Sequence, residues 1–272
     1  MKSGRVLVCA GSDSGGGAGI QGDIKTIAAL GGFAATAVTA LTAQNTRGVQ
    51  GVAGVAPAFI RLQIRSVLED IGADAIKTGM LADVATIGAV CDALAEYGPG
   101  IPLVADPVMV AKGGHPLLAA DAVATLVARL LPMAAIITPN LPEAEALTGL
   151  AIATVDDMRR AADALLAKGV RAVLLKGGHL EGPVLTDLLA TEDGIEAFES
   201  PRIESRHTHG TGCTLASAIA CGIAEGMTLR DAVLRGRAYV RAAMRAAPGL
   251  GAGHGPLGHG VTIDPARLEK LA

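Results

Sequence analysis

The sequence predicts an α/β fold in which a mostly parallel central sheet is covered by helices on both faces. Short apolar runs of strand type alternate along the chain with longer runs whose apolar residues recur at helical spacing. Strands connected through helices run parallel, and a parallel sheet needs helices on both faces to bury it. No linker, low-complexity segment or internal repeat interrupts this alternation, so we expect one domain over residues 1–272.

Apolar periodicity predicts the helices. Ile20 and Ile27 fall on one face of the first predicted helix. Pro57 suits the first turn of the second, where its missing N–H costs no hydrogen bond, and Asp156 and Asp157 suit the first turn of another. The predicted helices span residues 18–30, 57–71, 84–97, 123–130, 155–166, 212–225 and 229–246.

Short apolar runs between these helices predict the strands. The last two runs follow each other without a helix, and Glu192-Asp193-Gly194 between them is typical of a hairpin turn. The Gly- and His-rich segment 249–260 is interpreted as a mobile loop. The predicted strands span residues 5–10, 35–41, 73–77, 103–105, 135–137, 172–175, 184–190 and 195–199.

Composition and charge argue against several classes of protein. The 23 basic and 26 acidic residues give a net charge of −3, and 2% of residues are aromatic, so nucleic acid is not an expected partner. Charges and glycines break each apolar stretch before it reaches the length of a membrane span, and residues 1–5 lead into a strand rather than a signal sequence. Cys9, Cys91, Cys213 and Cys221 form no C-x-x-C pair, so we expect free thiols in a cytoplasmic protein without a membrane partner.

The most informative stretch is the polar, Gly-rich turn of residues 207–214 (HTHGTGCT), which leads into a predicted helix. Helix N-termini have unpaired N–H groups and partial positive charge, and therefore bind anions. Gly210 and Gly212 lack the side chains that would keep an anion away from these groups. Cys213 falls in the first turn, where the helix dipole favours a thiolate. The same residues are also compatible with a Gly-rich loop before a core helix that contains a structural cysteine.

Polar residues also collect where the other predicted strands end. Ligands in open α/β sheets bind beyond the carboxyl ends of the strands. Because parallel strands present these ends at one edge of the sheet, we expect the polar segments to form one rim around a ligand. The segments are residues 11–19, 42–45, 77–80, 106–109, 138–143 and 176–179.

Two common phosphate motifs do not hold. Residues 17–22 fit G-x-G-x-x-G, but the acid that should bind the ribose is missing, because no Asp or Glu occurs between Lys25 and Glu69. A nicotinamide oxidoreductase is therefore not favoured. A P-loop would end in Gly-Lys-Ser/Thr, whereas Gly22 is followed by Asp23. No histidine or cysteine spacing fits a zinc site.

Segments that match a known family run in order along the chain: GSDSGGGAGIQGD at 11–23, TALTAQNT at 39–46, KTGML at 77–81, DPVMVAK at 106–112, TPNLPE at 138–143 and HGTGC at 209–213. On these segments the chain resembles the ribokinase-like kinases, most closely the hydroxymethylpyrimidine/phosphomethylpyrimidine kinases of thiamine biosynthesis. The resemblance implies a single ribokinase-like domain that uses ATP and Mg²⁺, is usually a homodimer, and phosphorylates one pyrimidine twice in succession. The alternatives are a pyridoxal kinase of the same fold and a non-catalytic pyrimidine-binding module.

For the phosphoryl group, the resemblance implies that the backbone amides of Gly210, Thr211 and Gly212 form an anion hole. It implies that Cys213 takes the proton of the attacking hydroxyl or orients that hydroxyl, and that Lys176 neutralises nucleotide phosphate. Without the resemblance, Lys176 would be interpreted as a solvated turn residue and Cys213 as an inert helix residue.

For the nucleotide, the resemblance implies contacts from Asp106, Asn140 and Glu143, together with Lys176 and Thr211. Glu143 and Asp106 would hold Mg²⁺, in part through water, because this hard cation prefers oxygen ligands and keeps several waters. Glu143 is equally explained as an acid at a helix N-terminus, where the dipole favours negative charge.

For the pyrimidine, the resemblance implies contacts from Gln44, Asp23, Gly11 and Met80. The Gln44 amide offers a donor and an acceptor to an aminopyrimidine edge. Asp23 is expected near the hydroxymethyl group, on the polar side of its helix. Met80 is expected to form an apolar wall for the ring, although ordinary core packing explains it nearly as well.

The remaining candidates are weaker. The family often has Ser-Gly-Asp or Gly-Gly-Asp after the residue equivalent to Lys112, whereas this chain has Gly-Gly-His, so His115 replaces an acid that could position phosphate or a lid. Lys112 is a weak candidate for a phosphate contact, and segments 112–116 and 249–260 are candidate lids. His207 and His209 are expected to shape their loop, and the cysteines other than Cys213 to be buried as small hydrophobic residues.

Overall fold

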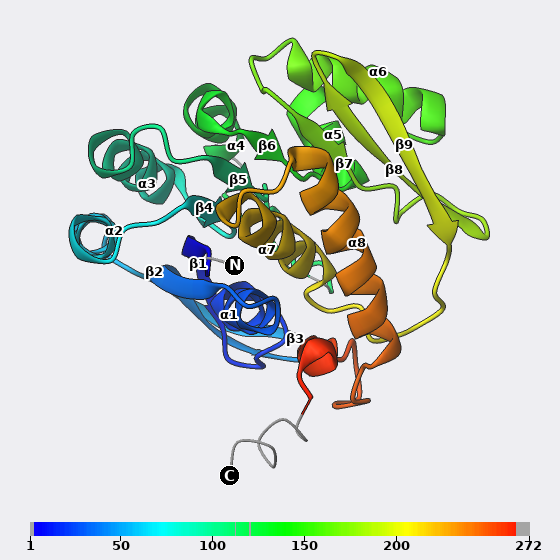
Figure 1. Ribbon diagram of the computed structural model, residues 1–272, viewed down its shortest axis with the longest axis horizontal. Coiled ribbons are helices and arrows are strands. Elements are labelled where there is room, and N and C mark those ends of the chain that lie inside the picture. Colours follow the sequence, from blue (N-terminus) through cyan, green and yellow to red (C-terminus); the bar gives the residue numbers. More distant parts are fainter. Residues whose placement is uncertain (1–2, 112, 120, 265–272) are drawn as a thin grey trace.

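Nine strands form one sheet in the order β3-β2-β1-β4-β5-β6-β7-β8-β9 (Figure 1). The computed structural model describes residues 3–111, 113–119 and 121–264. Neighbouring strands from β2 to β7 in this order pair in parallel, whereas β3, β8 and β9 pair antiparallel at the two edges. The strands are Arg5–Asp13 (β1), Phe33–Asn45 (β2), Gly48–Gly54 (β3), Ala75–Thr78 (β4), Leu103–Ala105 (β5), Ile136–Ile137 (β6), Val173–Leu175 (β7), Val184–Thr191 (β8) and Gly194–Pro201 (β9).

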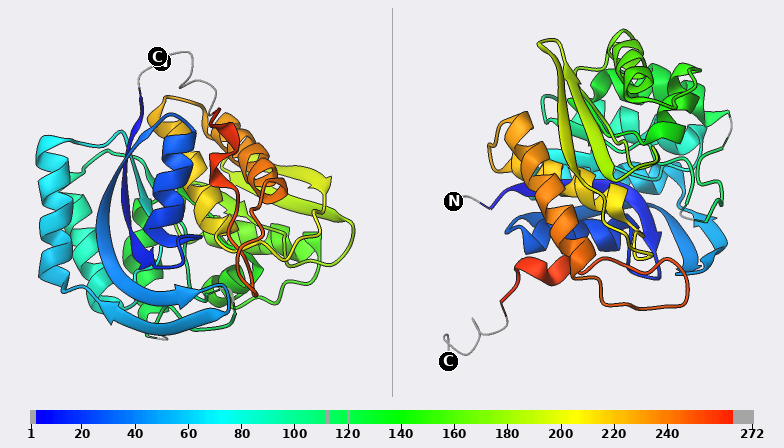
Figure 2. Two further views of the ribbon diagram at one scale, coloured as in Figure 1. Left: turned by 90° about the horizontal axis from the view of Figure 1, so that it is seen from below. Right: turned by 90° about the vertical axis from the view of Figure 1, so that its right-hand side faces the viewer.

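Helices cover both faces of this sheet, which confirms the predicted fold class (Figures 1 and 2). Helices α2 to α6 pack on one face, and α1, α7 and α8 pack on the other. The helices are Gly19–Ala29 (α1), Pro57–Asp70 (α2), Val84–Tyr97 (α3), Ala122–Thr125 (α4), Leu141–Thr148 (α5), Val155–Leu166 (α6), Thr211–Ala224 (α7) and Leu229–Arg245 (α8). A π-helical turn Leu126–Leu130 and a 3-10 turn Leu131–Met133 continue α4, and a further 3-10 turn spans His259–Thr262.

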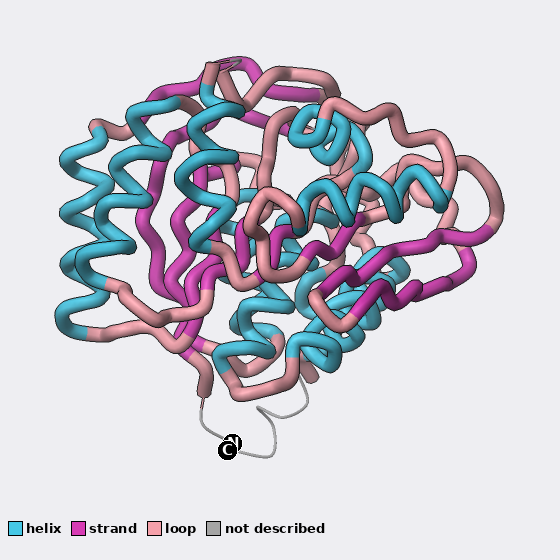
Figure 3. Tube along the Cα trace, turned by 90° about the horizontal axis from the view of Figure 1, so that it is seen from above, coloured by secondary structure: helices cyan, strands magenta, loops and turns pink. Residues whose placement is uncertain are grey.

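Two aliphatic cores follow from the alternation of side chains along the buried strands. Leu7 and Cys9 of β1 pack against the layer of α2 to α6, whereas Val6 and Val8 pack against the layer of α1, α7 and α8. The tube view shows the helices in cyan packed beside the strands in magenta (Figure 3). Helix α7 is buried along most of its length, which its run of small residues from Leu215 to Ala220 permits.

Two elements were not predicted. Strand β3 forms a hairpin with β2, and its three glycines obscure the alternation that would mark a strand. Helix α5 begins directly after Asn140 and has 8 residues, which is too short for apolar periodicity to be visible. The predicted helix 123–130 is also divided into an α-helical turn and a π-helical turn.

The segment 249–260, interpreted from the sequence as a mobile loop, is packed against two other parts of the chain. The N–H of His254 donates to the Thr46 carbonyl at 2.8 Å, and the N–H of Gly258 donates to the Ala243 carbonyl at 2.9 Å. A Cβ on Gly253 would lie 2.0 Å from the Thr46 carbonyl oxygen, so the close approach requires glycine. This segment therefore forms a fixed wall beside β2.

None of the described helices combines the length and the hydropathy that a bilayer span requires.

Candidate active site

A cleft of about 830 Å³ opens at the carboxyl ends of the parallel strands, where the sequence predicts a ligand rim. It extends from the β1 and β2 ends, across those of β4 to β7, to the first turn of α7. Eleven of the predicted site residues line it: Gly11, Gln44, Met80, Asp106, Asn140, Glu143, Lys176, Gly210, Thr211, Gly212 and Cys213. The structure thus gathers segments that are far apart in the sequence around one space.

The first turn of α7 presents its backbone to this cleft. Gly210 is the N-cap residue, with a left-handed φ of 84°, and no side chain caps the helix. A Cβ on Gly210 would lie 2.0 Å from the Gly17 carbonyl oxygen, so both the backbone conformation and the close approach require glycine. The uncapped N-terminus leaves N–H groups available to an anion in the cleft.

Lys176 adds a cation beside this turn. A Cβ on Gly212 would lie 3.2 Å from Lys176 Nζ, so the ammonium group approaches the helix where glycine leaves space. Nζ lies 3.2 Å from Asp106 Oδ1, which also accepts a hydrogen bond from the Thr138 hydroxyl at 3.1 Å. Burial disfavours the charged ammonium, but attraction to Asp106 and Glu143 outweighs burial and raises the pKa of Lys176. Lys176 is therefore charged at neutral pH.

Asn140 and Glu143 form a capping box at the start of α5. The Asn140 N–H donates to Glu143 Oε2 at 2.8 Å, and the Glu143 N–H donates to Asn140 Oδ1 at 2.9 Å. Burial raises the pKa of Glu143 to about 7, although Lys176 acts in the opposite direction. The interpretation of Glu143 as a helix N-terminal acid thus has a geometric basis, and the same carboxyl group also lines the cleft.

Carboxylates near the cleft do not form a compact metal cluster. Among the described residues, no three or more His, Cys, Asp or Glu side chains are grouped so as to hold a metal ion. Asp106 and Glu143 nevertheless line the same cleft. Two carboxylates suit Mg²⁺ that keeps several waters and binds phosphate oxygens, rather than an ion enclosed by protein ligands.

Burial favours the thiol form of Cys213, against the thiolate that the helix dipole was expected to favour. Burial raises its pKa to about 11, which Asp23 and Asp106 reinforce, whereas Lys77 acts in the opposite direction. The helix dipole was expected to favour the charged form, but loss of hydration at this position outweighs it. At neutral pH the sulfur therefore faces the cleft in its protonated form.

Asp23 lies on the buried face of α1, not on the polar side that we expected. Its side chain has no exposure and is absent from the cleft lining. Both carboxylate oxygens lie 2.9 Å from Lys77 Nζ, and the Ser217 hydroxyl donates to Oδ1 at 2.7 Å. Asp23 therefore reaches the cleft through Lys77, which does line it.

Lys77 is a site residue that the sequence analysis did not single out, although it closes a predicted strand. Burial disfavours its charge, but Asp23 outweighs this effect and raises the pKa of Lys77. The sequence does show a lysine at the end of an apolar predicted strand. A lysine buried at such a position needs an acidic partner, so this pattern could have identified Lys77 as a paired residue of the site. Which acid supplies the counter-charge is not visible in the sequence, since Asp23 is 54 residues away.

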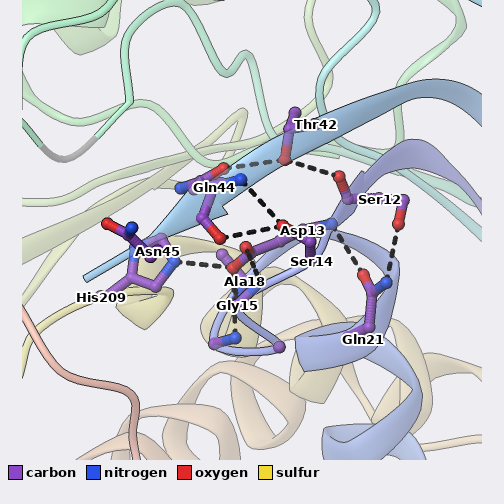
Figure 4. A network of polar contacts seen from close by, with 12 residues as sticks. Ser12, Asp13, Ser14, Gly15, Ala18, Gln21, Thr42, Gln44, Asn45 and His209 are labelled. Atoms are coloured by element: carbon purple, nitrogen blue, oxygen red, sulfur yellow. Dashed lines mark hydrogen bonds and ion pairs between the residues drawn. The ribbon is translucent and has the colours of Figure 1, made fainter. Parts of the chain in front are cut away.

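Gln44 lies near the end of β2, where it lines the cleft and contacts neighbouring polar groups (Figure 4). The Thr42 hydroxyl lies 2.9 Å from the Ser12 carbonyl oxygen and 3.1 Å from Gln44 Oε1. Met80 is 8% exposed, and a Cβ on Gly11 would lie 3.0 Å from its sulfur. An amide that can donate and accept thus stands near an apolar wall, which suits a flat polar ring.

The remaining candidates are placed as follows. His209 is buried and contacts Asp13, while His207 does not line the cleft. His115 lies in a turn whose backbone bonds to Ala111. Lys112 lies outside the described residues.

The model of the phosphomethylpyrimidine kinase family matches residues 13–258 of this chain. The hydroxymethylpyrimidine/phosphomethylpyrimidine kinase of Streptomyces coelicolor is 50% identical over 255 residues, which cover 94% of each chain. The thiamine biosynthesis bifunctional protein ThiED of Geobacter sulfurreducens is 52% identical over 264 residues, which cover 97% of this chain and 54% of that protein. This chain therefore spans about half the length of the latter relative. An ADP complex of Bacillus subtilis pyridoxal kinase superposes with a TM-score of 0.88 and 35% identity, covering 96% of this chain and 98% of that one.

Proposed function

Because this chain belongs to the phosphomethylpyrimidine kinase family, we propose that it uses ATP to phosphorylate 4-amino-5-hydroxymethyl-2-methylpyrimidine and then phosphorylates the monophosphate to the diphosphate. This family membership confirms the resemblance found on the sequence segments. The observation that carries the proposal is that the uncapped start of α7, Lys176 and Gln44 line one cleft. Phosphoryl transfer depends chiefly on positioning and on stabilising negative charge, and this arrangement is suited to both.

The α7 end of the cleft suits the transferring phosphoryl group. We propose that its oxygens lie against the backbone N–H groups of Gly210, Thr211 and Gly212, with the Lys176 ammonium beside them. Negative charge spreads over these oxygens in the transition state, and donors that are already aligned stabilise it without reorganisation. The buried carboxylate of Asp106 keeps Lys176 at this position through their 3.2 Å contact.

Cys213 is proposed to orient the attacking hydroxyl group. A sulfur with a pKa of about 11 is not a resting thiolate, so it is poorly suited to removing a proton before transfer begins. A loose phosphoryl-transfer transition state makes little demand on early proton removal. Cys213 lies in the first turn of α7 and lines the cleft, so its sulfur would stand next to the proposed phosphoryl site.

Asp106 and Glu143 are proposed to hold Mg²⁺ together with nucleotide phosphate and water. When bound, the ion would neutralise charge on the phosphate oxygens. Asn140 would keep Glu143 in place through the capping box, and Lys176 would balance the remaining negative charge. Burial raises the pKa of Glu143 to about 7, and a bound divalent cation would favour its carboxylate form.

Gln44 is proposed to read the aminopyrimidine edge. Its amide presents a donor and an acceptor, which match an amino group beside a ring nitrogen. Gly11 and Met80 would form the apolar wall against the ring, as their close contact allows. Asp23 would act indirectly, by keeping Lys77 charged at the cleft that Cys213 also lines.

Pyridoxal is the second candidate substrate, because the pyridoxal kinase of Bacillus subtilis shares this fold at 35% identity. Purified protein is incubated with Mg-ATP and one of three substrates in parallel reactions: hydroxymethylpyrimidine, its monophosphate or pyridoxal. The products are identified by mass spectrometry. We expect pyrimidine monophosphate and diphosphate, with kcat/KM at least about tenfold above that for pyridoxal. Turnover of pyridoxal alone would overturn the pyrimidine assignment. Pyrimidine binding without turnover would instead indicate a non-catalytic binding module.

We also propose that residues 1–272 act as one kinase domain that assembles as a homodimer in the cytoplasm. A continuous sheet that includes each described strand supports the single domain. Exposed apolar side chains on β2, β3 and α2 support a self-association surface, among them Leu41, Val52, Phe59 and Leu62. Light scattering should give twice the chain mass of 27.2 kDa, and a mass of one chain would exclude the dimer.

A further inference from the structure

The His209 side chain is wedged between the turn before α7 and the loop that joins β1 to α1 (Figure 4). Its Nε2 lies 2.7 Å from Asp13 Oδ2, and the residue is 8% exposed. Gly17 makes room for the ring, because a Cβ there would lie 2.5 Å from His209 Cδ2. The backbone N–H of His209 donates to the Gly255 carbonyl at 3.2 Å. One residue thus joins three segments that are distant in sequence.

Asp13 is the acceptor at the centre of this contact. Its Oδ1 accepts from the Gly15 N–H at 2.8 Å, and its Oδ2 accepts from the N–H groups of Gly17 at 3.1 Å and Ala18 at 2.9 Å. Burial alone would raise the pKa of Asp13, but His209 and these N–H groups together lower it. Asp13 is therefore a carboxylate, which can only accept, so His209 Nε2 carries a hydrogen and donates it.

The loop that Asp13 organises is also fixed to Gln44. The Ser14 hydroxyl donates to the Gln44 carbonyl at 2.9 Å and accepts from the Gln44 N–H at 2.8 Å. The Thr42 hydroxyl lies 2.9 Å from the Ser12 carbonyl oxygen. A displacement of the β1–α1 loop would therefore displace the residue proposed to read the pyrimidine edge.

On its other side, the same loop touches the turn proposed to hold the phosphoryl group. The Gly17 carbonyl oxygen stands 2.0 Å from where a Cβ on Gly210 would lie, so the backbones of the two segments are in close contact. His209 precedes Gly210 directly, so its contact with Asp13 joins the two halves of the cleft through side chains.

We propose that His209 is a positioning residue, which acts through Asp13 to keep the pyrimidine-binding half of the cleft in register with the phosphoryl-binding turn. This inference rests on the proposed function, because it concerns the same site. His209 would control the alignment of the hydroxyl oxygen with phosphorus rather than the affinity for either substrate. A misplacement of about 1 Å at a reacting centre is enough to lower the rate on the order of a hundredfold.

The test compares His209→Ala and His209→Gln with His207→Ala, a matched change two residues away in the same loop. We expect His209→Ala to lower kcat by about 10- to 100-fold, with the dissociation constants of ADP and the pyrimidine within about threefold of wild type. His209→Gln, whose amide N–H can donate to Asp13, should recover at least about fivefold of the lost kcat. His207→Ala should stay within about twofold of wild type.

The double variant Asp13→Asn/His209→Ala tests the connection between the two residues. If both act through one contact, the double variant loses little more kcat than the worse single variant. If the fold-loss of kcat in the double variant equals the product of the two single losses, the proposal is overturned. A kcat of His209→Ala within about twofold of wild type would also overturn it. A loss that is equal in His207→Ala, or that follows the melting temperature across the variants, would also overturn it.

Amide hydrogen exchange separates this inference from the proposed function, because it needs no substrate. His209→Ala should speed exchange in residues 13–18 and 209–213, whereas His207→Ala should leave residues 13–18 unchanged. Unchanged exchange in residues 13–18 of His209→Ala would overturn the positioning role. If the wild-type protein turns over pyridoxal alone, the pyrimidine assignment fails, and the kcat comparison is repeated with pyridoxal to test His209.

Discussion

The ammonium group of Lys77 lies 2.9 Å from both carboxylate oxygens of Asp23, and neither side chain is exposed to solvent. The Ser217 hydroxyl also donates to Asp23, and Lys77 lines the cleft together with Cys213. Removing two charges from water is costly, and their mutual attraction offsets this cost when the geometry is good. Asp23 therefore keeps Lys77 charged at the cleft, whereas burial alone would favour the neutral amine.

Asp23→Asn should destabilise the protein strongly, because it leaves the Lys77 charge buried without a counter-charge. We expect the free energy of unfolding to fall by about 3–5 kcal/mol, measured by urea denaturation. The double variant Asp23→Asn/Lys77→Met contains neither charge and should recover most of this loss. Additive losses in the double variant would show that the two residues do not act as a pair.

Gly210→Ala should remove activity, because it combines a left-handed φ of 84° with a clash against the Gly17 carbonyl. We expect a stability loss of about 1–3 kcal/mol and a kcat at least about 100-fold lower, since the turn must move away from the cleft. Gly226→Ala is the matched control, because Gly226 has a φ of 87° and no atom lies within 4 Å of where its Cβ would stand. It should lose about 1 kcal/mol of stability and keep full activity. Equal activity in the two variants would contradict the role of the turn.

Cys213→Ala should retain pyrimidine binding while lowering kcat by about 100-fold or more. If the sulfur orients the hydroxyl, Cys213→Ser preserves a polar partner and should stay within about tenfold of wild type. If a thiolate base is needed instead, the serine and alanine variants should be equally impaired. Steady-state kinetics with saturating ATP separates the two outcomes.

The pH profile gives an independent check on Cys213. Its pKa is raised from 9.0 to about 11, so the thiol does not ionise appreciably at neutral pH. A plot of wild-type kcat against pH should therefore show no ionisation of Cys213 near pH 9. The wild type and Cys213→Ser should have the same profile in this range. An ionisation step that disappears in Cys213→Ser would show that the sulfur acts as a thiolate.

His259 should make the protein sensitive to acid. Burial, reinforced by Lys25, lowers its pKa from 6.5 to about 4, and its Nε2 lies 3.0 Å from the Thr214 hydroxyl oxygen. Between these two pH values the folded protein binds fewer protons than the unfolded chain, so stability falls as pH falls from 6.5 towards 4. His259→Gln keeps a polar partner for Thr214 and should flatten this part of the urea-unfolding profile.

Glu143 also changes the stability of the protein between pH 4.5 and 7, but in the opposite direction to His259. Its contribution must therefore be removed before the effect of His259 on the unfolding profile is measured. The pKa of Glu143 is raised from 4.5 to about 7, so its contribution to stability is lost as pH rises between these values. Measuring the wild-type and variant His259 in a Glu143→Gln background isolates the histidine. An acid-induced loss of equal size with and without His259 would assign the effect to other groups.

Helices with a full apolar period could be predicted from the sequence, including Val84–Tyr97 and Val155–Leu166 at their observed ends. These segments could be identified as helices because their apolar residues recur at helical spacing over several turns. Helix α5 was missed because its start depends on hydrogen bonds between Asn140 and Glu143, and its apolar residues span two turns. Strand β3 was missed because pairing with β2, rather than its own side chains, makes it a strand.

The rim of the cleft could be predicted from the sequence, because parallel strands deliver their carboxyl ends to one edge. The partners of individual charges could not. Asp23 was expected at the substrate, and its burial became evident only when Lys77 and Ser217 were brought beside it. The Asp13–His209 contact joins residues 196 positions apart, and no local pattern records such a pairing.

The hydrogen bond from Ser217 to Asp23 has a consequence for the order in which the chain acquires its shape. A ribosome releases β1 and α1 long before α7, so the first strand waits for a helix made 194 residues later to cover its charged neighbours. Until then Asp23 lacks the Ser217 hydroxyl that contacts it in the folded protein. A chain stopped before α7 would therefore lack both the Ser217 hydroxyl that contacts Asp23 and the first turn of α7 that lines the cleft.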